Sequence, residues 1–378
     1  MAYSFEIGPI RPPNEAHSLL IRATRNCAWN KCKFCNSYKG KSFELRSVSD
    51  IKRDIDIART MMDKIQEITV KSGHSGGMQR VVSMVLNDPP NESFRNVALW
   101  LYGGGESVFI QDANCLVMKT GDLAEVVQHI RTTFPSVKRI TAYARSLNAA
   151  KKKPAELLDL KYSGLSRLHV GLESGYDPLL EFMNKGESSA DHIKGGRKII
   201  EAGISLSEYI ILGLGGKEFS TLHSLNTARV LNEINPDFIR VRTLVVNQSV
   251  PLNAEIKAGK FLRASDEEII REERTLIENL NVNSYYVSDH LSNLLQELQG
   301  QLPGDKEKLL DVLDKFEGLP AKEKENFMVG RRVGLYKTLK DMEDWQKHEL
   351  VEQIKFKLNK GNKKLAPEVI FSLMEEFI

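Results

Sequence analysis

Cysteine is scarce in this chain, because its 378 residues contain only four. A disulfide-stapled secreted protein needs more, and the first 18 residues, MAYSFEIGPIRPPNEAHS, lack the basic start and apolar run of a signal peptide. We therefore expect a reducing, cytoplasmic setting. The chain also lacks an apolar run near the roughly 20 residues that a membrane-spanning helix needs, so no membrane partner is expected.

An excess of one charge is also missing. The 53 basic and 50 acidic residues leave a net charge of +3, which gives no general attraction to nucleic acid or anionic lipid. We therefore expect no nucleic-acid partner, and the balance favours a small-molecule substrate. The 41% hydrophobic residues are enough for a core, and the length favours one large α/β domain with an appendage.

Short apolar runs alternate with longer amphipathic segments, which is the pattern of a parallel sheet with crossover helices. The predicted strands are residues 18–23, 97–102, 139–143, 167–171, 205–212 and 238–246. The predicted helices are residues 50–68, 122–134, 154–161, 192–202, 222–234 and 266–280. Six such units predict an α/β fold, a partial (β/α)6 barrel of the TIM type. A doubly wound open sheet is the alternative, because strand order cannot be read from the sequence.

The pattern divides the chain into regions. Residues 1–17 form an N-terminal extension and residues 18–290 the partial barrel. Residues 36–96 enlarge the first crossover into an inserted lobe, which includes the stretch KSGHSGGMQR. Residues 291–378 show charged, leucine-containing patterns without strands, so a helical C-terminal region is predicted.

Three of the four cysteines lie within nine residues, in the sequence CAWNKCKFC directly after the first predicted strand. In α/β barrels such a loop opens at the catalytic edge. Cys27, Cys32 and Cys35 have the spacing C-x4-C-x2-C, and three thiolates can hold an iron–sulfur cluster with one iron left open. Structural zinc prefers four ligands, yet a zinc site or an incidental cysteine loop is the alternative. Cys115 is a fourth ligand, a hydrogen-atom donor or a buried inert thiol.

Four motifs together resemble the radical S-adenosylmethionine superfamily. They are the cysteine triplet, Phe34 just before its last cysteine, the stretch LYGGGES after the second predicted strand, and the glycine-rich end of EYIILGLGG. The resemblance covers residues 18–246, and the stretch GLESG is similar to the coproporphyrinogen dehydrogenase, Elongator-type and methylthiotransferase enzymes. The first cysteine gap is one residue longer than the usual C-x3-C-x2-C, so no subfamily is identified.

The resemblance implies a [4Fe-4S] cluster that binds S-adenosylmethionine and cleaves it reductively to a 5'-deoxyadenosyl radical. This chemistry implies a low-potential electron donor, a ferredoxin or a flavodoxin, and anaerobic handling. The implied site residues are Cys27, Cys32 and Cys35 as cluster ligands, Phe34 near the adenine, Gly104, Gly105 and Glu106 on the methionine amine, and Gly213 and Gly215 supporting the adenine.

Other polar residues follow the predicted strands. Arg145 is a candidate for the cofactor carboxylate, because a guanidinium binds a carboxylate through two parallel hydrogen bonds. Glu173 and Ser174 suit ribose hydroxyls or a polar substrate, or Ser174 and Asp177 cap the next helix. Arg240 and Arg242 are further candidates, which face either a carboxylated substrate or the carboxylates of Glu173 and Glu208. Asp289 and His290 form either a proton-transfer pair or a structural pair.

The sequence therefore predicts a radical S-adenosylmethionine enzyme that abstracts hydrogen from a small, carboxylated substrate. Modification of a tRNA or a peptide by the same chemistry is one alternative. A non-catalytic metal-binding or cluster-carrying protein is the other.

Overall fold

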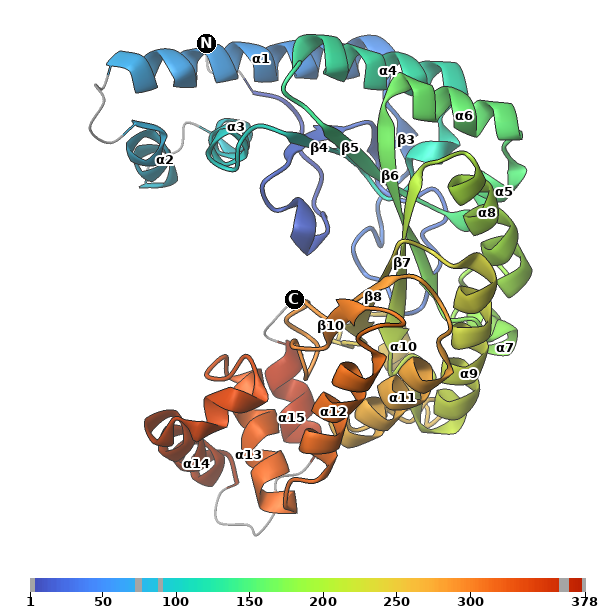
Figure 1. The fold of residues 1–378 in the computed structure, drawn as a ribbon, viewed down its shortest axis with the longest axis vertical. Helices are drawn as coiled ribbons and strands as arrows, with labels where there is room; N and C mark the ends of the chain where they lie inside the picture. The colour runs from blue at the N-terminus through green and yellow to red at the C-terminus, as the bar shows by residue number, and fades with distance from the viewer. Residues whose placement is uncertain (1–3, 72–76, 88–90, 360–366, 376–378) are drawn as a thin grey trace. The chain divides into compact units, whose positions relative to one another are not determined.

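The structure, a computed structural model, describes residues 4–71, 77–87, 91–359 and 367–375. The chain forms two compact units, each built from more than one segment (Figure 1). Unit 1 contains residues 1–30, 37–170 and 194–206. Unit 2 contains residues 31–36, 171–193 and 207–378.

The sheet of unit 1 is parallel, and its strands are adjacent in chain order. Hydrogen bonds join β1 (Leu19–Arg22) to β4 (Ser107–Gln111), β4 to β5 (Arg139–Ala144), and β5 to the first six residues of β6 (Leu165–Glu173). The register pairs Leu19 with Val108 and Ala142 with Leu168. In the chain segment that connects β1 to β4, the short strands β2 (Thr24–Arg25) and β3 (Glu44–Leu45) form a separate antiparallel pair.

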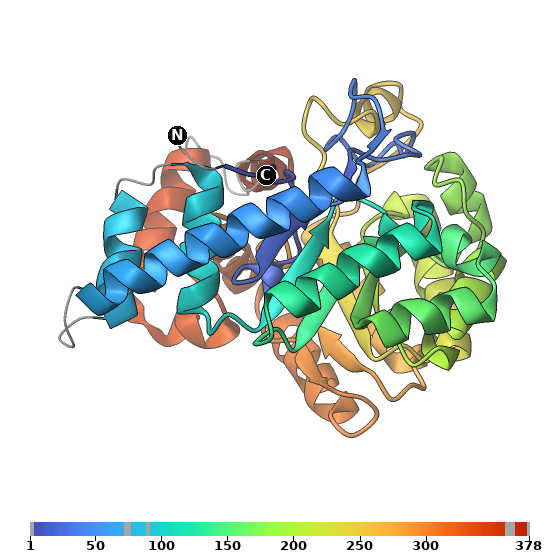
Figure 2. The same cartoon turned by 90° about the horizontal axis from the view of Figure 1, so that it is seen from above.

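Helices cover this sheet because their apolar residues recur every three to four positions. In α1 (Val48–Lys71), Ile51, Ile55, Ala58 and Met62 are all buried. Figures 1 and 2 show α1, α4 (Thr120–Thr133) and α6 (Pro154–Ser163) as neighbours in one layer. The other elements of unit 1 are η1 (Pro13–Glu15), α2 (Gly77–Asn87), α3 (Glu92–Tyr102), η2 (Cys115–Val117), α5 (Ser146–Lys151) and most of α8 (Ser189–Glu201).

Unit 2 continues the same architecture. β7 (Ser205–Leu212), β8 (Phe238–Thr243) and β9 (Tyr285–Val287) are parallel, and β10 (Gln299–Gln301) is antiparallel to β9. The helices of this unit are α7 (Asp177–Phe182), α9 (Gly216–Ile234), α10 (Leu252–Lys257), α11 (Asp266–Asn279), α12 (Lys306–Glu317), α13 (Ala321–Arg332), α14 (Trp345–Asn359) and α15 (Pro367–Glu375), with the 3-10 turn η3 (Leu339–Glu343).

The predicted fold class, an α/β partial barrel of the TIM type, is confirmed. Within each unit the parallel strands follow one another in chain order, whereas a doubly wound sheet reverses its order. All six helices predicted before residue 290 are present, and five of the six predicted strands are β1, β5, β6, β7 and β8. The apolar run before Asp289 is β9.

The strand predicted at residues 97–102 is wrong, because these residues belong to α3. The side chain of Asn91 accepts a hydrogen bond from the Phe94 amide and starts this helix, and Val97 and Trp100 are buried three positions apart. A short apolar run does not separate a buried strand from a buried helix. The prediction missed the strand β4, which is separated from the end of α3 by four residues. A second missed strand, β10, lies in the region predicted to be helical.

The C-terminal helices follow the prediction in part. The region predicted to be helical contains α12, α13, α14 and α15 and the 3-10 turn η3, but it also contains the strand β10. Part of the stretch KSGHSGGMQR, residues 72–76, lies outside the described residues. Among the described helices, none combines the length and the apolar character that crossing a bilayer requires.

Candidate functional site

The first half of the cysteine loop belongs to unit 1 and is held by Asp112, the residue that follows β4. One carboxylate oxygen of Asp112 accepts the Asn26 amide at 3.1 Å and Arg22 Nη2 at 2.6 Å. Its other oxygen accepts the Tyr38 hydroxyl at 2.7 Å. Asp112 is fully buried, so these charge-assisted bonds fix the backbone immediately before Cys27. The prediction missed Asp112, because β4 itself was missed.

The loop backbone is irregular. Asn26 and Asn30 both take left-handed conformations, with φ of 67° and 47°. Asparagine tolerates this region better than other non-glycine residues. The Asn30 amide donates to the Cys27 sulfur over 3.4 Å, and amide hydrogen bonds of this kind are a means of tuning thiolate ligands.

The second half of the loop, residues 31–36, belongs to unit 2. The Lys33 amide donates to the Met183 carbonyl at 2.9 Å, and the Leu252 amide donates to the Lys33 carbonyl at 2.8 Å. Lys33 Nζ forms an ion pair with Glu255 at 2.7 Å. Phe34 packs against an apolar cluster formed by Leu179, Met183, Leu214, Val246, Val250, Leu252 and Phe261. Lys33 and Phe34, which lie between Cys32 and Cys35, therefore anchor this half of the loop to unit 2.

The four cysteines form no disulfide, and they fall into two classes by exposure. Cys27, Cys32 and Cys35 are partly exposed, whereas Cys115 is fully buried in η2. Burial raises the pKa of Cys115 to about 12, so its thiol stays neutral. This matches the buried inert thiol among the three interpretations of Cys115.

The donor chemistry of the triplet suits an iron–sulfur cluster, with three partly exposed cysteines outside any disulfide on an irregular loop. In the described part of the chain, no three His, Cys, Asp or Glu side chains are grouped closely enough to hold a metal ion. Cys27 belongs to one unit and Cys32 and Cys35 to the other. The ligand assignment therefore depends on thiol chemistry and on spacing along the chain.

Arg145 follows β5 at its carboxyl end. Its guanidinium lies over the ring of Trp29, a residue of the cysteine loop, at 5.1 Å from the ring centroid. Its amide donates to the side-chain oxygen of Asn114 at 3.2 Å. Unit 1 thus places a cation against the cysteine loop, as the assignment to a cofactor carboxylate requires.

Gly104, Gly105 and Glu106 occupy a different place from the one predicted. Because residues 97–102 form a helix, these residues precede β4 and lie at its amino end, away from the carboxyl edge. The Gly104 and Gly105 amides donate to carbonyls of α3, and the exposed Glu106 carboxylate pairs with Lys138 at 2.6 Å. This stretch closes a helix, and the expectation that it ends a strand is corrected.

Glu173 and Ser174 end β6, as predicted, and both belong to unit 2. Glu173 has φ of 62°, an uncommon conformation for a residue with a side chain. Its carboxylate lies 3.2 Å from Lys185 Nζ, and a Cβ at Gly171 would collide with it. Ser174 is buried, and its hydroxyl accepts the Tyr176 amide at 3.1 Å, so the hydroxyl does contact the start of α7.

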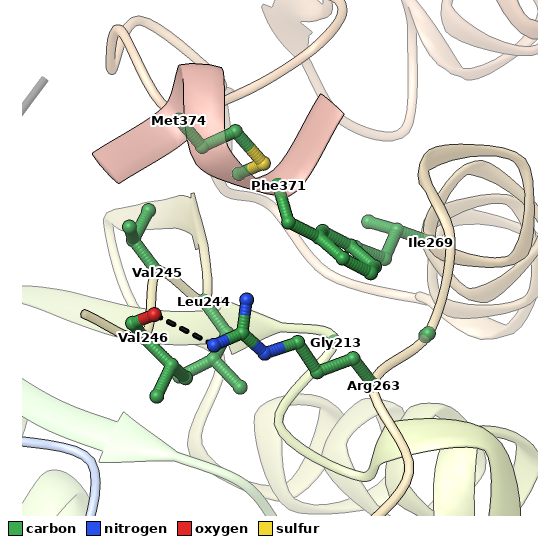
Figure 3. A pocket seen from close by; sticks show the side chains of 9 residues that line it. Gly213, Leu244, Val245, Val246, Arg263, Ile269, Phe371 and Met374 are labelled. Carbon is green, nitrogen blue, oxygen red and sulfur yellow. Dashed lines mark hydrogen bonds between the residues drawn. The ribbon is translucent and has the colours of Figure 1, made fainter. Parts of the chain in front are cut away.

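Gly213 and Gly215 lie between β7 and α9, at the carboxyl edge. Gly213 has φ of 78°, which favours glycine, and Gly215 precedes the first turn of α9. A pocket with about 360 Å³ of atom-free space, partly open to solvent, lies beside Gly213 (Figure 3). Figure 3 shows Arg263 donating to the Val246 carbonyl, at 2.7 Å, and Phe371 of α15 facing Ile269.

Arg240 and Arg242 both lie in β8, two residues apart, as predicted. Arg240 forms an ion pair with Asp289 at 3.1 Å, and Arg242 lies over the Tyr209 ring at 4.8 Å. The carboxylate that faces Arg240 is therefore Asp289. The Glu173 carboxylate pairs with Lys185 instead.

Glu208, the other predicted partner of the arginines, is fully buried in β7. Neither of its carboxyl oxygens has a hydrogen-bond partner among the described residues. Burial raises its pKa well above the usual value, which favours the protonated form of this carboxyl group.

Asp289 and His290 follow β9. In a proton-transfer pair the Asp289 carboxylate would orient the His290 imidazole, but here Asp289 pairs with Arg240 and His290 contacts Ser292. Nδ1 of His290 accepts the Ser292 amide at 3.2 Å and lies 2.7 Å from the Ser292 hydroxyl. Burial, together with Arg242, lowers the pKa of His290 to about 4. His290 is therefore a neutral imidazole oriented by Ser292.

Sequence reasoning missed two buried residues that contact the predicted loops of unit 2. His223, in α9, lies 2.8 Å from the Ser174 hydroxyl through Nδ1. Glu272, in α11, accepts the Gly213 amide at 2.5 Å. Both positions fall on buried faces of amphipathic helices, where a polar residue interrupts the apolar pattern. That interruption was the available indication in the sequence.

No family model matches this chain. Over 127 residues it is 26% identical to an uncharacterized protein of Methanocaldococcus jannaschii, over 34% of each chain. Over 108 residues it is 23% identical to the tRNA uridine(34) acetyltransferase of the same organism, over 28% of this chain and 20% of that protein. The chain therefore spans about a third or less of these curated relatives.

Among solved structures, the chain is similar to Elp3 of Methanocaldococcus infernus, with 14% identity and a TM-score of 0.43 over 63% of this chain and 61% of that chain. It is similar to the Escherichia coli coproporphyrinogen III oxidase HemN, described as a radical SAM enzyme, with 14% identity and a TM-score of 0.43 over 69% and 52%.

A third similar structure is the radical S-adenosylmethionine methyltransferase TsrM of Kitasatospora setae, with cobalamin and a [4Fe-4S] cluster bound. It has 13% identity and a TM-score of 0.45, over 90% of this chain and 61% of that chain.

Proposed function

We propose that this chain is a radical S-adenosylmethionine enzyme. The observation that carries the proposal is the loop CAWNKCKFC, with three partly exposed cysteines that form no disulfide, directly after β1 and β2. Cys27, Cys32 and Cys35 would hold a [4Fe-4S] cluster. When bound, the cluster supplies one electron to S-adenosylmethionine, and the bond from the sulfonium sulfur to the 5' carbon breaks to give methionine and a 5'-deoxyadenosyl radical.

The chain's own residues bind and orient the cofactor. In unit 1, the Arg145 guanidinium beside Trp29 suits the cofactor carboxylate. In unit 2, Ser174 and the open backbone at Gly213 suit the adenosyl part, because both lie where a strand ends at the carboxyl edge. Gly104, Gly105 and Glu106 are not used, because they lie at the amino end of β4.

The substrate we propose is a small carboxylated molecule. Arg242 is the cation of β8 that lies over the Tyr209 ring, while Arg240 pairs with Asp289. Neutral His290 can donate through Nε2, because Nδ1 accepts the Ser292 amide. These residues would bind and orient the substrate, with the hydrogen atom to be abstracted facing the cofactor, and the bound cofactor would supply the radical chemistry. A ferredoxin or a flavodoxin would supply the electron.

The test is anaerobic reconstitution with iron and sulfide, followed by S-adenosylmethionine and a strong reductant. We expect a brown protein with about four iron atoms per chain that releases 5'-deoxyadenosine. A colourless protein that binds about one zinc ion would overturn the proposal in favour of a zinc site. A fully loaded cluster that releases no 5'-deoxyadenosine would leave the cluster-carrying alternative in its place.

A further inference from the structure

A buried carboxylate holds the glycine turn at the end of β7. Glu272 of α11 is 3% exposed, and its two oxygens have different donors. Oε1 accepts the Gly213 amide at 2.5 Å, and Oε2 accepts the Ser220 hydroxyl at 2.6 Å. Gly213 and Glu272 are 59 residues apart in the chain, so the turn depends on a distant helix.

His223 connects the same turn to the end of β6. Its Nε2 lies 3.1 Å from the Ile211 carbonyl, which can only accept, so Nε2 carries the proton. Nδ1 must then accept the Ser174 hydroxyl at 2.8 Å. Burial lowers the pKa of His223 to about 4, in agreement with a neutral ring. Nε2 also lies 3.6 Å from Glu272 Oε1, which makes the carboxylate and the imidazole neighbours.

These contacts form one chain of buried polar groups within unit 2: Ser174, His223, Glu272 and Gly213. It joins two loops that the sequence motifs GLESG and GLGG had indicated separately, through two residues outside both motifs. Buried networks of this kind fix one conformation, because each unsatisfied member would be costly.

We propose that Glu272 and His223 are positioning residues that hold the loops after β6 and β7 in the conformation that binds the adenosyl part of S-adenosylmethionine. Neither residue contacts the cofactor in this proposal. Glu272 acts by orienting the Gly213 backbone, and His223 acts by orienting the Ser174 hydroxyl. The inference deepens the proposed function and rests on it.

Glu273, the next residue of α11, provides a matched control. It is 2% exposed, and its carboxyl group accepts the Tyr286 hydroxyl at 2.9 Å. It therefore shares the helix, the burial and the chemistry of Glu272 but contacts β9 rather than the glycine turn. Both replacements change a buried carboxyl group, but only Glu272→Gln removes an acceptor from the glycine turn.

The experiment compares Glu272→Gln, Glu273→Gln and the wild type. Titration calorimetry with S-adenosylmethionine on the anaerobically reconstituted proteins measures affinity, and iron content measures the cluster. Glutamine keeps one acceptor but turns an NH2 group toward the other donor, so we expect roughly tenfold weaker binding for Glu272→Gln. Glu273→Gln should bind like the wild type, and iron content should be equal in all three.

Amide hydrogen exchange without cofactor gives a second readout. A peptide that contains Gly213 should exchange faster in Glu272→Gln than in Glu273→Gln. In turnover, the KM for S-adenosylmethionine should rise more than kcat falls. If Glu272→Gln fails to fold, Ser220→Ala is the second variant. Ser220 is half-buried, and its replacement removes one of the two hydrogen bonds to Glu272. We expect about threefold weaker binding of S-adenosylmethionine.

The outcomes separate the two proposals. Equal affinity in Glu272→Gln and the wild type would overturn the positioning role while the proposed function stands. Equal loss in Glu272→Gln and Glu273→Gln would show a general effect of replacing a buried carboxyl group and would also overturn it. A reconstituted wild type that binds no S-adenosylmethionine would overturn the proposed function instead.

Discussion

Two glycine-rich turns of this chain look alike in sequence, residues 103–105 and residues 213–216, yet they occupy opposite ends of their strands. The first precedes β4, and the second follows β7. In the first turn, the Gly103, Gly104 and Gly105 amides donate to carbonyls of α3, a helix a few residues away. In the second, the Gly213 amide donates to the Glu272 carboxylate of a distant helix.

The difference teaches that glycine content identifies a turn but not its role. A turn that satisfies its amides with the preceding helix is a local structure that ends the helix. A turn at the carboxyl edge that depends on a buried carboxylate is built by tertiary contacts, at the edge where α/β barrels place their chemistry. The comparison therefore supports the proposal that the second turn, and not the first, binds the cofactor.

The largest expected effect tests whether the chemistry lies at the carboxyl edge at all. Cys32→Ser should lose the cluster, with its visible absorbance and iron content, and release no 5'-deoxyadenosine after reconstitution. Cys115→Ala is the control, because the Cys115 thiol is buried and neutral, and it should keep both. Cofactor cleavage by Cys32→Ser would contradict the ligand assignment.

Alanine in each turn compares the two glycines directly. Both have positive φ, 78° at Gly213 and 99° at Gly104, so each substitution should cost about 1 kcal/mol of stability. A Cβ at Gly213 also lies 3.0 Å from Ile269 Cδ1, whereas at Gly104 the nearest atom is 3.9 Å away. We expect tenfold weaker S-adenosylmethionine binding, or worse, for Gly213→Ala.

Gly104→Ala should bind the cofactor like the wild type when both variants are measured by calorimetry. The reverse result, with affinity lost in Gly104→Ala and kept in Gly213→Ala, would return the cofactor role to the first turn.

Glu272, which holds the second turn, should contribute to the pH dependence of the free energy of unfolding. Burial raises the pKa of Glu272 to about 7 and that of Glu273 to about 8. A carboxyl group with a raised pKa binds its proton more tightly when folded, so its stabilising contribution is lost as pH rises through that pKa. His223, with a pKa lowered to about 4, acts in the opposite direction below pH 6.5.

Between pH 6.5 and 8 the free energy of unfolding should therefore fall by roughly 2 kcal/mol, measured by urea unfolding. In Glu272→Gln the fall should be smaller and shifted toward pH 8, where Glu273 titrates. An identical pH dependence in the two proteins would show that Glu272 does not titrate in this range.

The smallest effect concerns Glu106. Its carboxylate is half exposed and pairs with an exposed Lys138, so Glu106→Gln should cost less than about 1 kcal/mol in thermal or urea unfolding. S-adenosylmethionine affinity should not change. A large loss of affinity here would show that the first turn binds the cofactor and would break the comparison.

Periodicity predicted the elements of this fold where segments were long. All six helices predicted before residue 290 and the strand predicted at 205–212 are present in the structure, because eight or more residues of a regular pattern specify a period. Residues 97–102 failed because six apolar residues fit a strand and a buried helix equally well. That one error moved Gly104, Gly105 and Glu106 to the wrong edge and hid Asp112.

The candidate site divides in the same way. Cys27, Cys32 and Cys35 were identified from the sequence, because ligand spacing is a property of adjacent residues. The partners of Arg240, Ser174 and Gly213 were not, since Asp289, His223 and Glu272 lie 49 residues or more from them in the chain.

The sequence by itself determined what local chemistry can specify: the cysteine loop, the period of the six predicted helices and five of the six predicted strands. Only the tertiary structure decided which end of a strand each motif occupies and which buried polar groups meet. The physical reason is that a pattern records neighbours along the chain, whereas a buried amide such as that of Gly213 must find its acceptor wherever folding brings one.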